Sequence, residues 1–194
     1  MAGTVAPDLR YVLPADGNRG WRSRLLAHLR RLGPASRRNR FLAVLADDGL
    51  RRHAEGARPE VVIFAVVDGR LRGCAEVHAT AGSQGRSAEI ALSVEDSHQN
   101  RGIGQALLKA ALKQCRHHHL DPVWVAYLPG NLPLRHLIDE AGFVEMPSVD
   151  PLYREARYRS VPPVLRIWRA CVLVAGWMFE GLWTLFGGAC KARG

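Results

Sequence analysis

The feature that most constrains the fold is a run of seven apolar, mostly β-branched residues, Val61-Val62-Ile63-Phe64-Ala65-Val66-Val67. Such a run is typical of a buried strand. Asp68-Gly69 follows it directly, and this dipeptide favours a tight hairpin that returns the chain over Leu71–Thr80. Another hairpin loop at Gly82–Gly85 leads into a strand over Ala88–Val94. The sequence therefore predicts a meander of three consecutive antiparallel strands.

Helix and strand patterns surround this meander on both sides. Before it, the elements predicted are a strand over Leu9–Pro14, a helix over Trp21–Leu32 that Gly33-Pro34 ends, a basic loop or turn at Arg37–Arg40, and a short helical region across Phe41–Leu45 and Leu50–Ala54. After it, they are a helix over Gly102–His118, a strand over Val123–Tyr127, a helix over Leu132–Glu140 that Gly142 ends, and strands over Phe143–Met146 and Tyr153–Tyr158. This order predicts an α/β fold of the α+β sandwich type.

Length and charge bear on the number of domains and on partners. The chain has 194 residues, which favours one compact domain with appendages, and its 47% hydrophobic content excludes a wholly disordered chain. Residues 1–40 hold nine arginines against two aspartates, whereas residues 41–150 hold slightly more acidic than basic side chains. Basic ends suit an acidic membrane surface, nucleic acid or an acidic partner.

Neither the cysteines nor the histidines indicate a metal site. The four cysteines are scattered and form no C-x-x-C pair, and the N-terminal residues lack the apolar run of a secretory signal, so a reduced, cytoplasmic protein is expected. His117-His118-His119 lie at the end of a predicted helix. Because consecutive helical residues point about 100° apart, these rings do not converge on one ion.

The segment Gln99-Asn100-Arg101-Gly102-Ile103-Gly104 stands where a strand ends and the longest predicted helix begins. The first N–H groups of a helix have no intrahelical partners and lie at its positive end. Glycine at 102 and 104 lets a diphosphate approach these amides, and Arg101 can add charge-assisted contacts. A Rossmann site is disfavoured because no third glycine follows, and a P-loop needs a Gly-Lys-Ser/Thr that is absent.

At these residues the chain resembles the GNAT N-acyltransferase superfamily. Gln99-x-x-Gly102-x-Gly104 resembles its Q/R-x-x-G-x-G/A pyrophosphate loop, and Asn131 with Gly142-Phe143 resembles the N-…-GF signature of its late helix. The resemblance covers roughly residues 8–147. Within it, Leu32–Phe41 further resembles the first helix–turn of bacterial protein-lysine acetyltransferases.

The resemblance implies a GNAT-like sheet, mixed but mostly antiparallel and flanked by helices, that binds acetyl-CoA without a metal. The strand Glu89–Val94 would splay from its neighbour and pair with the pantetheine arm, and Asn131 would face the cofactor near the thiol. The residues expected to bind the cofactor are Leu92, Ser93, Val94, Gln99, Asn100, Arg101, Gly102, Ile103, Gly104, Gln105 and Asn131.

The reaction implied is attack by a neutral amine on the thioester, which needs a base for the ammonium proton and support for the departing thiolate. Glu89 is the candidate base, because the lysine-acetyltransferase branch places a glutamate at the start of this strand, and Glu76 is the reserve. Many family members carry a tyrosine four residues before the glycine of the G-F pair, and here that position is Ile138. The Tyr127 hydroxyl, or a backbone N–H with solvent, remain as alternatives.

The acceptor is a primary amine, either a protein lysine or a small-molecule amine. The main alternative function is a non-catalytic acyl-CoA-binding or scaffold protein on the same fold, because the tyrosine is absent and a tail is added. Nucleic-acid binding by the arginines of Trp21–Arg31 is disfavoured, because this stretch lacks a recognisable binding motif.

The tail exceeds what the family core needs. We expect residues 1–158 to form the acyltransferase domain and residues 159–194 a hinge, at Val161-Pro162-Pro163, followed by a hydrophobic helix. Only Glu180 is charged between Ala170 and Cys190, a length that reaches about 31 Å as a helix. Glu180 in mid-span would cost about 2.5–3.5 kcal/mol. The alternatives for residues 163–190 are a membrane surface, a partner subunit, or the domain's own surface.

Overall fold

The computed structural model describes residues 6–17, 20–82, 85–147 and 150–158. The chain divides into two units, Met1–Arg159 and Ser160–Gly194. The predicted hinge and hydrophobic tail belong to the second unit and lie outside the described residues. Within the described ranges, no helix has the length and apolarity needed to cross a bilayer.

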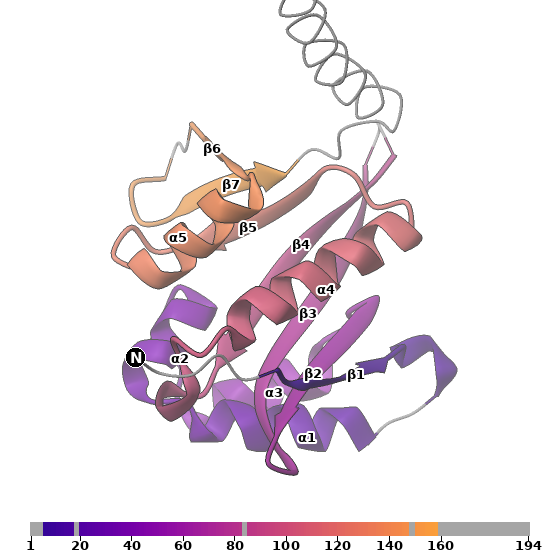
Figure 1. The fold of residues 1–194 in the computed structure, drawn as a ribbon, viewed down its shortest axis with the longest axis vertical. Coiled ribbons are helices and arrows are strands. Elements are labelled where there is room, and N and C mark those ends of the chain that lie inside the picture. The colour runs from indigo at the N-terminus through magenta and orange to yellow at the C-terminus, as the bar shows by residue number, and fades with distance from the viewer. Residues whose placement is uncertain (1–5, 18–19, 83–84, 148–149, 159–194) are drawn as a thin grey trace, which may run out of the picture. The chain divides into compact units, whose positions relative to one another are not determined.

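A mixed sheet forms the centre of the first unit (Figure 1). Its strands are β1 (Asp8–Val12), β2 (Val61–Val67), β3 (Arg70–Gly82), β4 (Gly85–Val94), β5 (Val123–Tyr127), β6 (Val144–Met146) and β7 (Arg154–Tyr158). The strand order is β1-β2-β3-β4-β5-β7-β6. All neighbours pair antiparallel except β4 and β5, which pair parallel. The predicted meander and the predicted GNAT-like sheet are therefore confirmed.

Helices cover both faces of the sheet, which explains why β2 is apolar along its whole length. The helices are α1 (Gly20–Arg31), α2 (Pro34–Phe41), α3 (Asp47–Gly56), α4 (Ile103–His117) and α5 (Leu132–Ala141). Val61 and Ile63 pack in a core with α4, whereas Val62 and Phe64 pack in a second core with α1 and α3. Successive side chains of a strand point to opposite faces, so one strand supplies both cores. Two short 3₁₀ turns, η1 (Pro14–Asp16) and η2 (Asp96–His98), complete the described elements.

The sheet opens between β4 and β5. These strands pair only at Ala88 with Val123 and at Glu89 with Trp124. β4 continues to Val94 on its pairing with β3, so its other edge has no strand partner beyond Glu89 in the described structure. Figure 1 shows the two strands diverging toward the end of the sheet where α4 begins. The opening places a gap in the sheet directly beside the glycine segment.

The main departure from the sequence prediction is α2. Arg37–Arg40 lies within a helix that starts at Pro34 and ends where Leu42 adopts a left-handed conformation, with φ 58°. Proline at the first helical position is favourable because its fixed φ suits the helix and its missing N–H is not needed there. The glycine-proline pair that ends the first predicted helix therefore also starts the next one.

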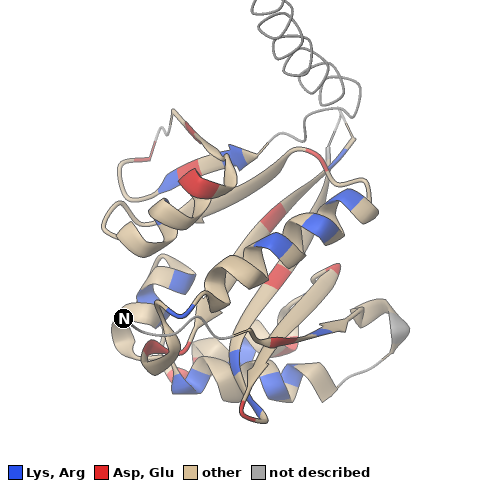
Figure 2. Cartoon of the chain, in the orientation of Figure 1, with Lys and Arg blue, Asp and Glu red and all other residues tan. Residues whose placement is uncertain are grey.

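Figure 2 marks basic positions along α1, and most of these side chains bind within the unit. Arg22 donates to the carbonyls of Glu55 and Ala57, at 3.2 and 3.1 Å. Arg30 pairs with Asp47 at 2.6 Å, and Arg31 pairs with Glu95 at 2.6 Å. These arginines therefore join α1 to α3 and to the end of β4, which leaves fewer of them for an external polyanion.

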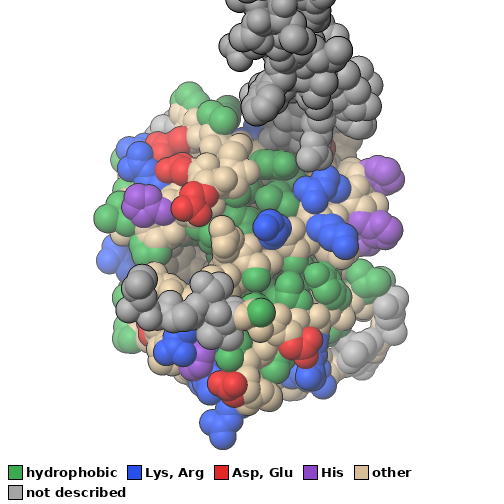
Figure 3. Space-filling model, viewed as in Figure 1, with side chains coloured by type: hydrophobic (Ala, Val, Ile, Leu, Met, Phe, Trp, Pro, Cys, Tyr) green, Lys and Arg blue, Asp and Glu red, His purple; other side chains and the backbone are tan. Residues whose placement is uncertain are grey.

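Helix α4 is amphipathic in the way its sequence predicts. Ile103, Leu107 and Ala111 are buried, and Lys109 and Lys113 are exposed. On the face shown in Figure 3, basic side chains gather over α4 among hydrophobic ones, whereas acidic side chains lie over α5. The helix therefore presents its first turn, rather than its outer face, to the opening in the sheet.

Candidate functional site

The first turn of α4 borders the opening between β4 and β5. Gly102 is the N-cap with φ 82°, a left-handed conformation that favours glycine, and no side chain caps this helix end. The first hydrogen bond of the helix runs from the Ala106 N–H to the Gly102 carbonyl at 3.0 Å. The N–H groups of the first-turn residues before Ala106 have no partner within the helix. The positive end of the helix is therefore available to an anion.

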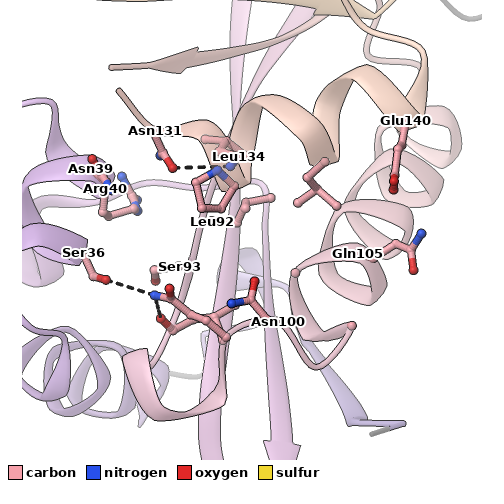
Figure 4. Close-up of a pocket in the computed structure, with 16 residues that line it drawn as sticks. Ser36, Asn39, Arg40, Leu92, Ser93, Asn100, Gln105, Asn131, Leu134 and Glu140 are labelled. Atoms are coloured by element: carbon pink, nitrogen blue, oxygen red, sulfur yellow. Dashed lines mark hydrogen bonds between the residues drawn. The ribbon is translucent and has the colours of Figure 1, made fainter. Parts of the chain in front are cut away.

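A cavity of about 520 Å³ lies between this turn, β4, α2 and α5. Figure 4 shows Ser36, Asn39 and Arg40 on one side, Asn131 and Leu134 on another, and Asn100 and Gln105 beside the start of α4. The lining residues are Ser36, Asn39, Arg40, Leu92, Ser93, Val94, Gln99, Asn100, Gly102, Gly104, Gln105, Asn131, Pro133, Leu134, Leu137 and Glu140. The cavity joins a helix N-terminus at one end to an unpaired strand edge along its side.

Of the residues predicted to bind the cofactor, all except Arg101 and Ile103 line this cavity. Ile103 is 1% exposed and packs in the core beneath the first turn, so its side chain has a structural role. Arg101 is partly exposed beside the turn. The structure therefore brings predicted residues between positions 92 and 131 together around the first cavity.

The N-…-GF signature marks the two ends of α5. Asn131 is the N-cap and its Oδ1 accepts a hydrogen bond from the Leu134 N–H at 3.3 Å. Gly142 is the C-cap with φ 85°, and the Phe143 N–H bonds the Ile138 carbonyl at 3.0 Å. Asn131 is also 8% exposed and lines the cavity, so one residue both starts α5 and contributes an amide to the site.

The glycine loop is tied to α2 by hydrogen bonds. Gln99 Nε2 donates to Ser36 Oγ at 3.0 Å and to the Val94 carbonyl at 3.2 Å. Ser36 Oγ donates in turn to Asp96 at 2.7 Å, and the Gly33 N–H donates to the same carboxylate at 2.8 Å. Burial opposes ionisation of Asp96, but these bonds outweigh it and lower its pKa. The glutamine of the motif thus positions the loop rather than pointing freely into the cavity.

A second cavity, of about 360 Å³, lies beside the first. Its lining residues are Asn39, Arg40, Phe41, Leu42, His53, His78, Glu89, Ile90, Ala91, Leu92, Val125, Ala126 and Leu134. Glu89 lines this cavity at the point where β4 and β5 separate. Its carboxylate makes no hydrogen bond or ion pair with any of the described residues, which leaves it open to an incoming group.

Glu76, the reserve base, has a different setting. It is 1% exposed, and its carboxylate pairs with Arg40, with His53 at 3.2 Å and with His78 at 3.5 Å. Burial disfavours the charged form of Glu76 and so acts to raise its pKa. The interactions with the Arg40 guanidinium and the two imidazoles outweigh this effect and hold the pKa of Glu76 well below the usual range. A carboxylate held so firmly in its ionised form is a weak proton acceptor.

Another buried chain of polar groups reaches the wall of the first cavity. His28 on α1 is fully buried, and its Nε2 lies 3.0 Å from Ser93 Oγ. Its Nδ1 lies 3.7 Å from Glu95, which also binds Arg31 and Arg72. Burial lowers the pKa of His28, so the ring is neutral at pH 7. Burial opposes the charge of Glu95, but contacts from His28, Arg72 and Arg31 lower its pKa to about 2.

No tyrosine among the described residues lines either cavity. Ile138, at the position where a tyrosine is common, is fully buried. Tyr127 is 1% exposed and its hydroxyl donates to Glu145 at 2.7 Å. Burial and this hydrogen bond raise the pKa of Tyr127 to about 12. Its hydroxyl is therefore already engaged away from the cavities.

Sequence reasoning missed the contribution of α2. Ser36, Asn39 and Arg40 line the first cavity from this helix. They stand at positions i, i+3 and i+4, which share one helix face. That spacing is the signal that would have found them, had Pro34 been interpreted as a helix start. In the part of the chain that the structure describes, no three His, Cys, Asp or Glu side chains gather as metal ligands.

Comparison with solved structures gives the same fold at low sequence identity. The GNAT domain of S. lividans PAT superposes with a TM-score of 0.62 at 21% identity, covering 78% of this chain and 89% of that one. Ribosomal-protein-alanine N-acetyltransferase from Brucella melitensis gives 0.55 at 17%, covering 78% and 99%. The protein yncA from Salmonella typhimurium, solved with its cofactor acetyl-CoA, gives 0.53 at 16%, covering 80% and 94%.

Comparison of sequences assigns the family. No curated protein matches the chain. The sequence model of the acetyltransferase (GNAT) family matches residues 29–143, which is more than half of the 194 residues. The matched span includes the unpaired edge of β4, the glycine turn and both ends of α5. The chain belongs to the acetyltransferase (GNAT) family.

Proposed function

We propose that the protein is an N-acetyltransferase that moves an acetyl group from acetyl-CoA to a primary amine. The observation that carries this proposal is the opening between β4 and β5. The start of α4, which has no side-chain cap among the described residues, borders the first cavity, and Glu89 lines the adjoining second cavity. Acetyl-CoA would place its diphosphate on the first turn of α4 and its pantetheine arm along the free edge of β4. Leu92, Ser93 and Val94 would then border the acyl end.

Glu89 is the proposed base. It lines the second cavity, which we assign to the amine acceptor, and no described residue binds its carboxylate. Glu76, in contrast, is buried and paired with Arg40. The amine must lose a proton to attack the thioester, and a positioned carboxylate accepts it directly or through water. No tyrosine of the described ranges lines the cavities, so we assign protonation of the departing thiolate to a backbone N–H and solvent.

The acceptor is proposed to be a protein lysine or a small-molecule amine. The resemblance of Leu32–Phe41 to the first helix–turn of bacterial protein-lysine acetyltransferases supports the first. The similar fold of an aminoglycoside acetyltransferase, with a TM-score of 0.55, supports the second. Incubating the full chain with acetyl-CoA and panels of lysine peptides and small amines, and detecting acetylated products by mass, decides between them.

The role of Glu89 has a direct test. Glu89→Gln should lower kcat by about 10²–10⁴-fold, because the amide cannot accept the ammonium proton, while the Kd of acetyl-CoA stays close to that of the wild type. Glu55→Gln, on the exposed side of α3 and outside both cavities, is the matched control. Full activity in Glu89→Gln would contradict the assignment.

A non-catalytic acyl-CoA-binding protein is the second candidate, because no described tyrosine reaches the cavities and Ile138 is buried. Tight binding of acetyl-CoA without turnover of any amine would favour it. Turnover that Glu89→Gln removes would exclude it.

The apolar segment over residues 163–190 is proposed to associate with a membrane surface or with a partner subunit. Fractionation of cells that produce the full chain separates these cases. Retention in membranes after salt and alkaline washes indicates insertion, release by alkali indicates a surface helix, and a soluble oligomer indicates a subunit contact.

A further inference from the structure

The two cavities share part of their lining, and this overlap locates the reacting atoms. Gly102 and Gly104 border only the first cavity, and Glu89 borders only the second. On the proposed function, the thioester comes from the first cavity and the amine from the second. The bond between them must form where the cavities adjoin. The residues that line both are Asn39, Arg40, Leu92 and Leu134.

Of the four described residues that line both cavities, Arg40 alone is charged, and its side chain is held firmly. Its side chain is 8% exposed and pairs with Glu76, which His53 and His78 also contact. The guanidinium carbon lies 4.9 Å from the centre of the Phe41 ring. Arginine has five N–H donors, and among the described residues this guanidinium donates only to Glu76. The remaining donors are available to a group at the junction.

We propose that Arg40 donates a hydrogen bond to the thioester carbonyl oxygen of bound acetyl-CoA and stabilises the oxyanion of the tetrahedral intermediate. Glu89 first accepts the ammonium proton of the substrate, directly or through water, and releases it to solvent. As the neutral amine nitrogen bonds the carbonyl carbon, the π electron pair moves to the oxygen beside Arg40. The intermediate then loses a second proton from nitrogen to solvent and expels the CoA thiolate, which takes a proton from solvent, and the amide carbonyl re-forms. A fixed donor in a water-poor site contributes much to such a step.

Glu76 has a defined part in this arrangement. Without a partner, a guanidinium so little exposed would carry a desolvation cost and would move toward water. Glu76, kept ionised by the Arg40 guanidinium and by hydrogen bonds from His53 and His78, holds Arg40 at the junction. Glu76 is therefore a positioning residue that acts through Arg40.

The decisive measurement is the ¹³C resonance of acetyl-CoA labelled at the thioester carbonyl. On binding to the full-length protein this resonance should move downfield, because a guanidinium polarises the carbonyl. Arg40→Lys keeps the positive charge but loses the planar, multi-donor guanidinium group. It should remove most of the downfield shift of the thioester carbonyl and lower kcat by about tenfold or more. The double variant Arg40→Gln/Glu76→Gln removes both charges together and should lower kcat by about 10²–10³-fold. Arg38→Gln, on the same helix but outside both cavities, is the control for helix effects.

A role limited to joining α2 to β3 predicts a different result. The variants would then keep the carbonyl shift and the wild-type kcat once folded, and that outcome would overturn the proposal while leaving acetyl transfer intact. Calorimetric binding of CoA itself, which lacks the thioester carbonyl, should be nearly unchanged in both variants. A matching loss of CoA binding would show that Arg40 holds the cofactor and would also overturn the proposal. If the wild-type protein failed to bind acetyl-CoA, the proposed function and this inference would both fall.

Discussion

Two glutamates on the same face of the sheet have opposite settings. Glu76 lies on β3 and Glu89 on β4, where Glu89 is the cross-strand partner of His78. Glu76 is buried and bound by Arg40, His53 and His78, whereas Glu89 faces a cavity without a partner among the described residues. Burial and pairing, rather than residue type, separate a structural carboxylate from a candidate base.

This contrast predicts different effects on stability. Glu76→Gln should lower the free energy of unfolding by about 3 kcal/mol or more, because it leaves Arg40 little exposed and without its counter-charge. Glu89→Gln should change it by less than about 0.5 kcal/mol. Urea denaturation of the two variants at pH 7 measures both values, and equal losses would contradict the assignment.

The buried His28 predicts a pH effect on stability. Burial lowers its pKa in the folded protein, so the unfolded chain binds a proton first as the pH falls below the ordinary histidine value of 6.5. The contribution of neutral His28 is therefore fully present above pH 6.5 and declines as the pH falls toward the folded pKa.

His28→Gln should accordingly cost less stability at pH 5.5 than at pH 7.5, since the wild-type protein loses this contribution at the lower pH and the variant does not. Urea denaturation of both proteins at the two pH values gives the difference. His117→Gln, at the exposed end of α4, controls for the removal of an ordinary histidine. A pH-independent cost would show that His28 does not titrate as described.

Among the elements, the start of α4 gives the sharpest prediction, because its two glycines differ. Gly102 has φ 82°, so Gly102→Ala should destabilise the fold by about 1–2 kcal/mol and weaken acetyl-CoA binding by distorting the turn. A Cβ at Gly104 would lie 3.4 Å from Leu137, an ordinary contact, so Gly104→Ala should stabilise the helix by about 0.5–1 kcal/mol. It should leave acetyl-CoA binding nearly intact, because the pyrophosphate-loop motif accepts either glycine or alanine at this position. Thermal unfolding and calorimetry test both, and the reverse pattern would contradict the geometry.

The elements that the sequence predicts best are those with strong local signals. β2 and β5 have the predicted bounds because apolar runs and turn residues delimit them, and Asp68 and Gly69 both adopt the positive φ that the hairpin needs. α4 and α5 begin and end within about one or two residues of prediction, as capping geometry allows. Gly102, Asn131 and Gly142 are helix caps, which is why these motif residues coincide with helix boundaries.

The parts that could not be predicted depend on contacts distant in sequence. α2 carries no apolar stripe and has no buried residue, so periodicity gave no signal for it. The site depends on α2 lying across from α5, and on Glu76 recruiting Arg40 from 36 positions away. Neither the pairing of His28 with Ser93 nor the second cavity follows from spacing along the chain, because each is created when the helices pack on the sheet.

At the scale of the whole molecule, one irregularity in the sheet organises the site. Parallel pairing of β4 with β5 stops after Glu89, and the free edge of β4, the first turn of α4, α2 and α5 surround the opening. The hydrophobic cores on both faces hold the strands on either side of the opening. The opening is thus fixed by the packing of the fold, and it separates the proposed cofactor side from the proposed acceptor side.

The central claim is that the cavity bounded by β4, the first turn of α4, α2 and α5 binds acetyl-CoA, and calorimetric titration of the full chain tests it most directly. We predict one binding site per chain, lost in Leu137→Trp, which fills the cavity beside Gly104. Leu132→Trp, on the same helix at a side chain that is 55% exposed, should bind as the wild type does. No heat of binding in the wild type, or undiminished binding in Leu137→Trp, would contradict the account.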